Sequence, residues 1–246
     1  MTNPGSRDLR VFPNLDRLSR AAAEEVLSIA QAAVDEHDRF TIALSGGSTP
    51  RTLYGLLASD FRAAMPWRKT QAFVGDERYV APGDPRSNYR MIRETLLDHA
   101  PIPRGHIHPV PTLEAEIEEA AEAYEQELMD YFPGQWPRFD LILLGMGPDG
   151  HIASLFPHNI VLDEEARVVA AVREESAEPP LRLTLTIPAI NHAAHIYFLI
   201  AGANKAAALA RAFAPHANPK ASPAAAINPI DGQLVWWVDE AAAGQL

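Results

Sequence analysis

Residues 40–58 read FTIALSGGSTPRTLYGLLA, and this stretch decides the fold of the 246-residue chain. Its first five residues, Phe40–Leu44, form an almost wholly apolar run, which is typical of a strand covered on both faces. The segment SGGSTP follows, with two glycines that suit a tight turn, and a helical pattern begins at Arg51. A buried strand, a glycine turn and a helix form the repeating unit of parallel α/β sheets.

The same alternation of strand-length apolar runs and helical patterns continues along the chain. The predicted strands are Phe40–Leu44, Ala72–Val74, Phe139–Leu144, Arg167–Val172, Leu181–Ile187, Ile196–Ala201 and Leu234–Val238. The predicted long helices are Leu15–Val34 (capped by Asn14), Leu113–Tyr131 and Asn204–Ala214. Because there is no internal repeat or flexible linker, the sequence predicts one α/β domain over residues 1–246. Its sheet is doubly wound, mostly parallel and flanked by helices.

Composition narrows the class of protein. Apolar residues make up 47% of the chain and charged residues 22%, which indicates a folded globular protein. Cysteine is absent, which excludes disulfides and fits a reducing compartment. The first residues, Met1–Asp8, contain no apolar signal segment, and no apolar run approaches the ~18 residues of a membrane span. The net charge of −11 argues against nucleic acid as a partner. We therefore expect a cytoplasmic protein without membrane or nucleic-acid partners.

Ligands of open α/β sheets bind in the loops beyond the carboxyl ends of the strands. The loop Ser45, Gly46, Gly47 and Ser48 opens a helix, whose free N–H groups and positive dipole end suit a phosphate. It does not match the Walker pattern, and a plain strand-to-helix turn with a hydroxyl cap explains it equally well. Arg78, in the loop GDERYV after the next predicted strand, is either a phosphate ligand or part of a solvated charged loop.

The loop after Phe139–Leu144 reads GMGPDGHIASLFP and carries the most chemistry. Its glycines fit the dinucleotide fingerprint G-x-G-x-x-G, but Pro157 leaves no room for the full helix which that motif requires. Asp149 and His151 instead place a carboxylate beside an imidazole, which is typical of a general base. We interpret His151 as functional.

Other polar residues are open to two interpretations. Arg182 and Lys205 each lie beside a predicted strand, where a single cation is equally consistent with ordinary surface charge. The pairs His106/His108 and His192/His195 lack the accompanying ligands of a metal motif, so we interpret them as structural and predict no metal site. The pair Trp236–Trp237 lies in an apolar strand and is predicted to be core.

Taken together, several motifs resemble the 6-phosphogluconolactonases, from about Thr41 to the end of the chain. These motifs are LSGGSTP (44–50), GDERYV (75–80), RSNYRMIRETLLD (86–98), LLGMGPDGHIASLFP (143–157), RLTLT with GANKA, and GQLVWWVDEAA (232–242). The related glucosamine-6-phosphate deaminases resemble the same blocks, but the second glycine of SGGS and the triplet Ser154–Phe156 favour the lactonase. Ile152 is the one departure, because lactonases more often carry threonine there.

The resemblance implies a modified Rossmann-type fold, similar to that of the deaminases, without a nicotinamide cofactor. It implies hydrolysis of 6-phospho-D-glucono-1,5-lactone, the second step of the oxidative pentose phosphate pathway. By this resemblance His151 activates water and Asp149 supports it. The residues expected near the phosphate or the developing oxyanion are Ser45–Ser48, Arg78, Arg182 and Lys205.

Two alternatives remain. A glucosamine-6-phosphate deaminase would use a carboxylate near Gly75–Glu77 as its base, for which Asp76 and Glu77 are candidates. A sugar-phosphate sensor without catalysis would normally carry a DNA-binding module, for which the chain has no room. The expected partner is a small sugar-phosphate lactone, and the expected state is a monomer or a weak homo-oligomer.

Overall fold

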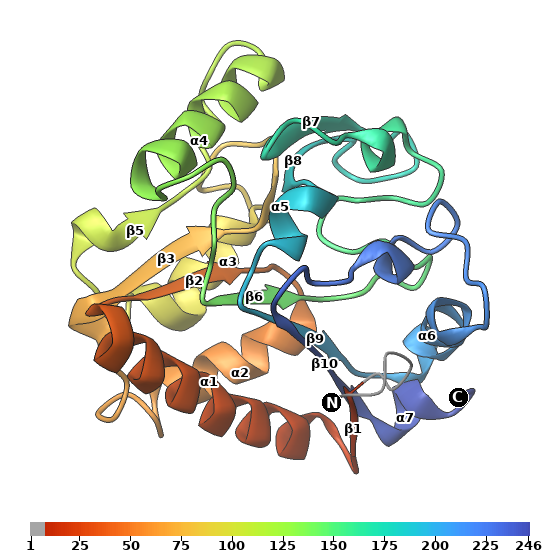
Figure 1. Cartoon of the computed structure of the whole chain (residues 1–246), viewed down its shortest axis with the longest axis horizontal. Helices are drawn as coiled ribbons and strands as arrows, with labels where there is room; N and C mark the ends of the chain where they lie inside the picture. The colour runs from red at the N-terminus through yellow and green to blue at the C-terminus, as the bar shows by residue number, and fades with distance from the viewer. Residues whose placement is uncertain (1–7) are drawn as a thin grey trace.

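The computed structural model describes residues 8–246, which form two sheets (Figure 1). Residues 1–7, where the sequence predicts no signal peptide, lie outside the described part of the chain. The main sheet has seven strands in the order β1-β10-β9-β6-β2-β3-β5, with every neighbouring pair parallel. Its strands are β1 (Asp8–Phe12), β2 (Phe40–Leu44), β3 (Thr70–Val74), β5 (Ile107–His108), β6 (Leu141–Leu144), β9 (His195–Ile200) and β10 (Gln233–Asp239).

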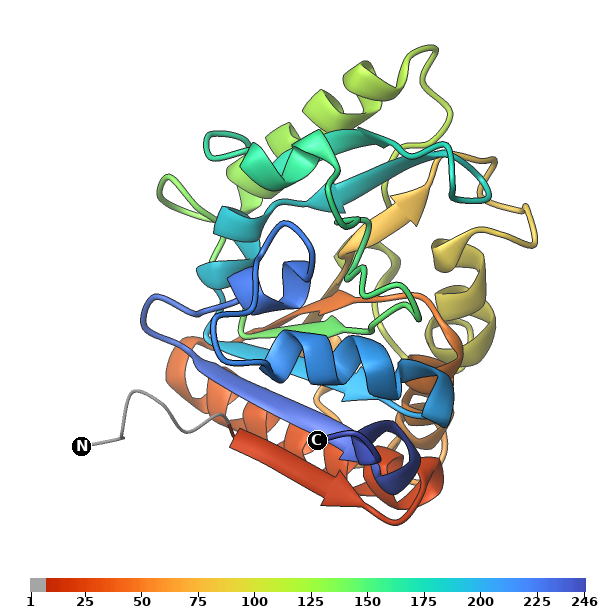
Figure 2. The ribbon, with the colours of Figure 1, turned by 90° about the vertical axis from the view of Figure 1, so that its right-hand side faces the viewer.

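Helices cover both faces of this sheet, which confirms the predicted doubly wound α/β fold. The helices are α1 (Leu15–His37), α2 (Ser48–Ala58), α3 (Asn88–Ile92), α4 (Ile117–Tyr131), α5 (Ile187–Asn191), α6 (Ala206–Phe213) and α7 (Glu240–Ala243). Figure 2 shows α6 in front of β9 and β10 and α1 behind them. The predicted Asn14 cap of α1 is confirmed, since its side chain accepts a hydrogen bond from the backbone N–H of Arg17. None of the helices in residues 8–246 is long and apolar enough to cross a membrane.

A second, antiparallel sheet is a feature that the sequence did not predict. It contains β4 (Asp76–Arg78), β8 (Leu181–Leu185) and β7 (Val169–Arg173) in that order. The segments of β7 and β8 were predicted as strands, but they pair with each other and not with the main sheet. The charged segment of β4, predicted as a loop, becomes a strand because β8 supplies its hydrogen-bonding partner.

Several element boundaries also differ from the prediction. The strands β1 and β5 were missed, because both are short edge strands whose pairing comes from distant parts of the chain. Helix α4 begins at Ile117 and not at Leu113, since the backbone is still extended at Glu116. The predicted helix at Asn204 starts as a 3-10 turn and becomes α-helical only at Ala206. The strand predicted to reach Ile187 ends earlier, because Thr186 caps α5.

The two sheets meet at Gly75. Its N–H donates to the carbonyl of Leu44 at 2.8 Å, which continues the parallel pairing of β2 with β3. Its carbonyl accepts the N–H of Leu185 at 2.9 Å, which belongs to the antiparallel sheet. One residue therefore ends the pairing with the main sheet and begins the pairing with the second sheet. From this point the two sheets diverge at the carboxyl ends of the central strands.

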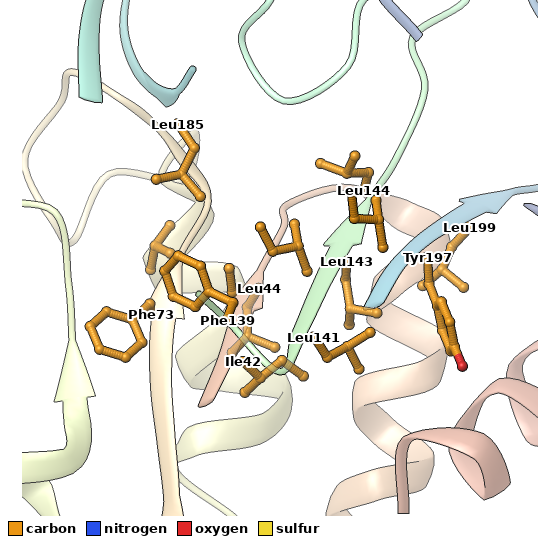
Figure 3. Close-up of a cluster of buried hydrophobic side chains, with 14 of the residues drawn as sticks. Ile42, Leu44, Phe73, Phe139, Leu141, Leu143, Leu144, Leu185, Tyr197 and Leu199 are labelled. Carbon is orange, nitrogen blue, oxygen red and sulfur yellow. The ribbon is translucent and has the colours of Figure 1, made fainter. Parts of the chain in front are cut away.

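The hydrophobic core packs against the main sheet and contains side chains from neighbouring strands. Figure 3 shows Ile42, Phe73, Leu143 and Tyr197 from β2, β3, β6 and β9, with Leu185 reaching in from β8. All five side chains are buried. Trp236 and Trp237 are also buried, which confirms that this pair belongs to the core. The strands that carry the polar loops are thus held by a continuous apolar layer.

Candidate active site

A cavity of about 200 Å³ lies where the loops after β2, β6 and β9 face the second sheet. It is lined by Ser45–Pro50 after β2, by Gly145–Pro148, His151 and Ala153 after β6, and by Lys205 after β9. Asp76, Arg78 and Arg182 of the second sheet and Asn88 of α3 complete its polar lining. The strand-end loops thus converge on one cavity, as the ligand rule for α/β sheets predicts.

The loop after β2 exposes the start of a helix to the cavity. Gly47 occupies the N-cap position of α2 with φ of 109°, a conformation that favours glycine, and no side chain caps the helix. The first turn contains no acidic residue, so the positive end of the helix dipole is not neutralised there. This geometry suits an anion bound by backbone N–H groups.

Tyr54 fixes the position of this loop from within α2. Its hydroxyl accepts the N–H of Ser45 at 3.0 Å and donates to the carbonyl of the same residue at 2.8 Å. Both backbone groups lie beyond the end of β2, where the sheet no longer pairs them, and Tyr54 is fully buried. Burial raises the pKa of the Tyr54 hydroxyl far above its ordinary value, so it remains a neutral donor and acceptor.

The loop after β6 holds an imidazole against a carboxylate. The Nδ1 atom of His151 lies 2.7 Å from Oδ1 of Asp149. A carboxylate accepts hydrogen bonds, so Nδ1 carries the proton and the neutral ring keeps its lone pair on Nε2. No hydrogen bond joins Nε2 to another residue in the part of the chain that the structure describes, and His151 lines the cavity. Nε2 is therefore the nitrogen available to a ligand.

The carboxylate partner is ionised across the physiological range. Burial raises the pKa of Asp149, but the hydrogen bond and the charge of His151 outweigh burial and lower this pKa to about 2. A second contact holds the loop from outside, because Nη2 of Arg211 donates to the Asp149 carbonyl at 2.9 Å. The ring of Phe156 packs against His151 at a centroid distance of 4.6 Å. The imidazole is thus fixed on several sides.

Glycines make this arrangement possible. A Cβ atom on Gly147 would lie 2.2 Å from Nδ1 of His151 and 2.3 Å from Oδ1 of Asp149, far inside contact distance. Gly150 has φ of 101°, and its N–H donates to the carbonyl of Gly147 at 3.1 Å, which closes the turn. The chain continues into a tight turn bridged between Ile152 and Leu155, with no helix after the third glycine. The loop is therefore built around the imidazole and does not follow the dinucleotide-binding pattern.

Three cations line the cavity without a carboxylate partner. Arg78 and Arg182 lie directly opposite each other on β4 and β8, and Lys205 follows β9. The two arginines donate to backbone carbonyls only, and within residues 8–246 no ion pair involves any of the three. Burial, and secondly the charge of Arg78, lower the pKa of Arg182, while burial lowers that of Lys205. The three cations therefore outnumber the one carboxylate of the described chain that lines the cavity, that of Asp76.

The structure brings most predicted site residues together and separates one of them. Asp149 lies behind His151, and the other residues predicted to bind or to catalyse line the cavity. Asp76 lines it as well. Glu77 does not: its carboxylate accepts the N–H groups of Arg78, Asn88 and Tyr89, each at 2.7 Å. Glu77 thereby ties β4 to the start of α3.

The four histidines that the sequence analysis set aside have other contacts. His108 lies 2.7 Å from Glu127 and 3.0 Å from Gln71, and its ring stacks on Phe73. His192 and His195 bind the carbonyls of Pro188 and Asp140. His106 forms a turn before β5.

Sequence reasoning missed three residues that shape the site. Asn88 donates its amide to the carbonyl of Asp76 at 2.8 Å, Ser154 donates its hydroxyl to the Asp76 carboxylate at 2.8 Å, and Arg211 holds the Asp149 carbonyl. Asn88 and Ser154 stand within motifs quoted for the family resemblance, so their neighbourhood was a signal. Nothing in the local sequence distinguishes Arg211, because its partner lies 62 positions away.

Comparisons with known proteins show which family the chain resembles. The family model of glucosamine-6-phosphate isomerases/6-phosphogluconolactonase matches residues 13–236. A 6-phosphogluconolactonase of Synechocystis is 48% identical over 87% of this chain and 88% of its own length. One from Nostoc is 43% identical over 98% of both chains. The structure of the 6-phosphogluconolactonase from Trypanosoma brucei superposes with a TM-score of 0.87 at 30% identity, covering 98% of this chain and 99% of that one.

The close approach of Gly147 to His151 and Asp149 gives a first prediction. Gly147→Ala is expected to separate His151 from Asp149, because the new methyl group would occupy the space of their hydrogen bond. The measurement is the ring Nδ1–H resonance of His151 by NMR, which should lose its protection from exchange with water. Gly55→Ala is the matched control, since its added Cβ meets no atom within 4 Å. An unchanged His151 resonance in Gly147→Ala would show that the loop accommodates the methyl group.

Proposed function

The chain belongs to the family of glucosamine-6-phosphate isomerases and 6-phosphogluconolactonases, and within it we propose that this enzyme hydrolyses 6-phospho-D-glucono-1,5-lactone to 6-phospho-D-gluconate. This reaction is the second step of the oxidative pentose phosphate pathway, and the enzyme is a carboxylic ester hydrolase. Relatives that are 43% and 48% identical over most of the chain bear the name of this activity.

The observation that carries the proposal is the orientation of His151. Its Nδ1 is held by Asp149, so Nε2 remains as the proton acceptor of a residue that lines the cavity. Water is a poor nucleophile at neutral pH, and a lactone carbonyl therefore needs a base within reach of the attacking oxygen. Asp149, ionised throughout, stabilises the imidazolium that forms when Nε2 takes the proton.

The reaction follows in two proton transfers. Water attacks C1 of the lactone as Nε2 of His151 takes one of its protons, which gives a tetrahedral oxyanion. When this intermediate collapses, the bond between C1 and the ring oxygen breaks, and the imidazolium returns the proton to that oxygen. The products are the C1 carboxylic acid, which ionises in water, and a free hydroxyl at C5. The imidazole is regenerated, so no further co-reactant is consumed.

The unpaired cations explain how an acidic protein binds an anionic substrate. The net charge of −11 repels a sugar phosphate at long range, so attraction must come from a local positive cavity. Arg78, Arg182 and Lys205 supply this charge, and the uncapped start of α2 adds backbone N–H donors from the Ser45–Ser48 loop. We assign these groups to the phosphate and to the developing oxyanion.

Two further properties belong to the proposal. We place the enzyme in the cytoplasm, in keeping with the absence of cysteine and the reducing conditions that this fits. We expect a monomer or a weak homo-oligomer that acts on a free small molecule. Glucosamine-6-phosphate deamination is the alternative activity, with the cavity-lining carboxylate of Asp76 as its base.

The activity itself is tested by offering two substrates. Freshly generated 6-phosphogluconolactone should give acid release well above its spontaneous hydrolysis, measured by titration at constant pH. Glucosamine 6-phosphate should give no ammonia. Release of ammonia without acceleration of lactone hydrolysis would establish the deaminase, and binding without either product would indicate a sensor.

The role of His151 gives the next prediction. His151→Asn keeps a polar side chain but removes the proton acceptor, so kcat should fall about 10²–10⁴-fold while the protein stays folded. Asp149→Asn should also lower kcat, because an amide no longer stabilises the imidazolium that forms during the reaction. A folded His151→Asn enzyme that keeps more than about a tenth of wild-type kcat would contradict the assignment.

The cations give a prediction on substrate preference. Arg182→Ala and Lys205→Ala should each lower kcat/KM for the phosphorylated lactone by roughly one to two decades, the usual value of a charge-assisted hydrogen bond. Turnover of unphosphorylated gluconolactone should change little. Lys220→Ala is the matched control, because Lys220 pairs with Asp163 outside the cavity. Equal losses on both lactones would instead give these cations a structural or directly catalytic role.

A further inference from the structure

The carboxylate of Asp76 places a negative charge in the cavity that we propose binds an anionic substrate. Its residue is only 6% exposed, and what remains accessible lines the same cavity as Arg78, Arg182 and Lys205. Removing a carboxylate from water is costly, and its charge repels a phosphorylated substrate. No ion pair within residues 8–246 involves Asp76, although its charge favours the charged form of Arg182. We assign the base position to His151, so proton abstraction does not require Asp76.

The structure fixes the orientation of this carboxylate. Its Oδ2 accepts the hydroxyl of Ser154 at 2.8 Å, and Ser154 is completely buried. The Asp76 carbonyl accepts the side-chain amide of Asn88 at 2.8 Å, and its backbone pairs with Thr184 of β8. By contrast, no residue of the described chain donates a hydrogen bond to Oδ1. One carboxylate oxygen is therefore anchored, and the other remains an available acceptor.

A second residue of the same cavity lining, Ser45, also has a polar atom without a partner in the described part of the chain. Ser45 is 4% exposed, its Oγ is buried, and no hydrogen-bond partner for Oγ exists among residues 8–246. Ser45 leaves β2 next to Gly75, since Leu44 and Val74 pair across β2 and β3, and it lines the same cavity. An unpaired buried hydroxyl is costly unless a ligand satisfies it.

Sugar hydroxyls suit both atoms, because each hydroxyl donates one hydrogen bond and accepts others. We infer that Asp76 is a specificity-determining residue which accepts a hydrogen bond from a ring hydroxyl of the lactone, with Ser45 donating to the same region of the substrate. The inference rests on the proposed lactonase function. It assigns Asp76 to recognition of the polyol and leaves proton transfer to His151. The 1,5-lactone carries hydroxyls at C2, C3 and C4, which are the three candidates.

The test combines one substitution with a series of deoxy substrates. The wild type is assayed on 6-phosphogluconolactone and on its 2-, 3- and 4-deoxy analogues, and one analogue should lose roughly one to two decades in kcat/KM. Asp76→Ala removes both carboxylate oxygens, whereas asparagine would keep an acceptor. It should lower kcat/KM for the parent lactone to the level of that analogue, with little further loss on the analogue itself. The discrimination at one ring position thus disappears.

Other outcomes separate the competing explanations. An equal loss on all four lactones would overturn the inference and give Asp76 a catalytic or structural role. No loss on any of them would also overturn it. If the wild type does not hydrolyse the parent lactone, the proposed function fails; if it does and Asp76→Ala keeps the full discrimination, only this inference fails.

Two further variants keep the test decisive. Should Asp76→Ala fail to fold, Ser45→Ala is measured on the same series and should weaken discrimination at the same ring position. Asp140→Ala is the control, because this part-buried aspartate also accepts a hydroxyl, from Thr41 at 2.7 Å, but lies just before β6, away from the cavity. It should leave the discrimination unchanged.

Discussion

The whole arrangement depends on Gly75, whose backbone N–H and carbonyl bond to two different sheets. Its N–H pairs with the parallel sheet through Leu44, and its carbonyl pairs with the antiparallel sheet through Leu185. The chain thereby changes partners within one residue, and the second sheet is anchored at a fixed angle to the first. A side chain at this position would contact the carbonyl of Leu44 at 3.5 Å. The cavity is the space that this branching opens, and β4 and β8 supply one of its walls.

Each polar group in that space is supported by a residue that does not itself need to touch a ligand. Tyr54 holds the backbone of Ser45, Arg211 holds the carbonyl of Asp149, and Ser154 holds the carboxylate of Asp76. These supports come from elements distant in sequence, and they reduce the freedom of the side chains that face the cavity. Such an arrangement limits the reorganisation that a bound substrate would otherwise require.

The sequence predicted what local patterns determine. The loops after β2 and β6 follow strongly apolar strands and carry glycines, so their position and their exposed residues were readable, including the pairing of Asp149 with His151. Asp76–Arg78 was not readable as a strand, because three consecutive charges become a strand only when β8 lies beside them. The bond between Ser154 and Asp76 spans 78 positions, and the opposition of Arg78 and Arg182 is created by strand register alone. Long-range pairing of this kind leaves no local signal.

The opposed arginines, Arg78 and Arg182, also make the stability of the folded chain depend on whether an anion is bound. Two like charges opposite each other on paired strands repel, and in the empty cavity only backbone carbonyls and a nearby carboxylate offset this repulsion. An anion that binds only the folded state relieves it and stabilises that state, by about 2.7 kcal/mol when the free ligand reaches 100 times its Kd. The population of opened molecules exposed to proteases would then fall as sugar phosphates accumulate, so metabolic flux itself would protect the enzyme that carries it.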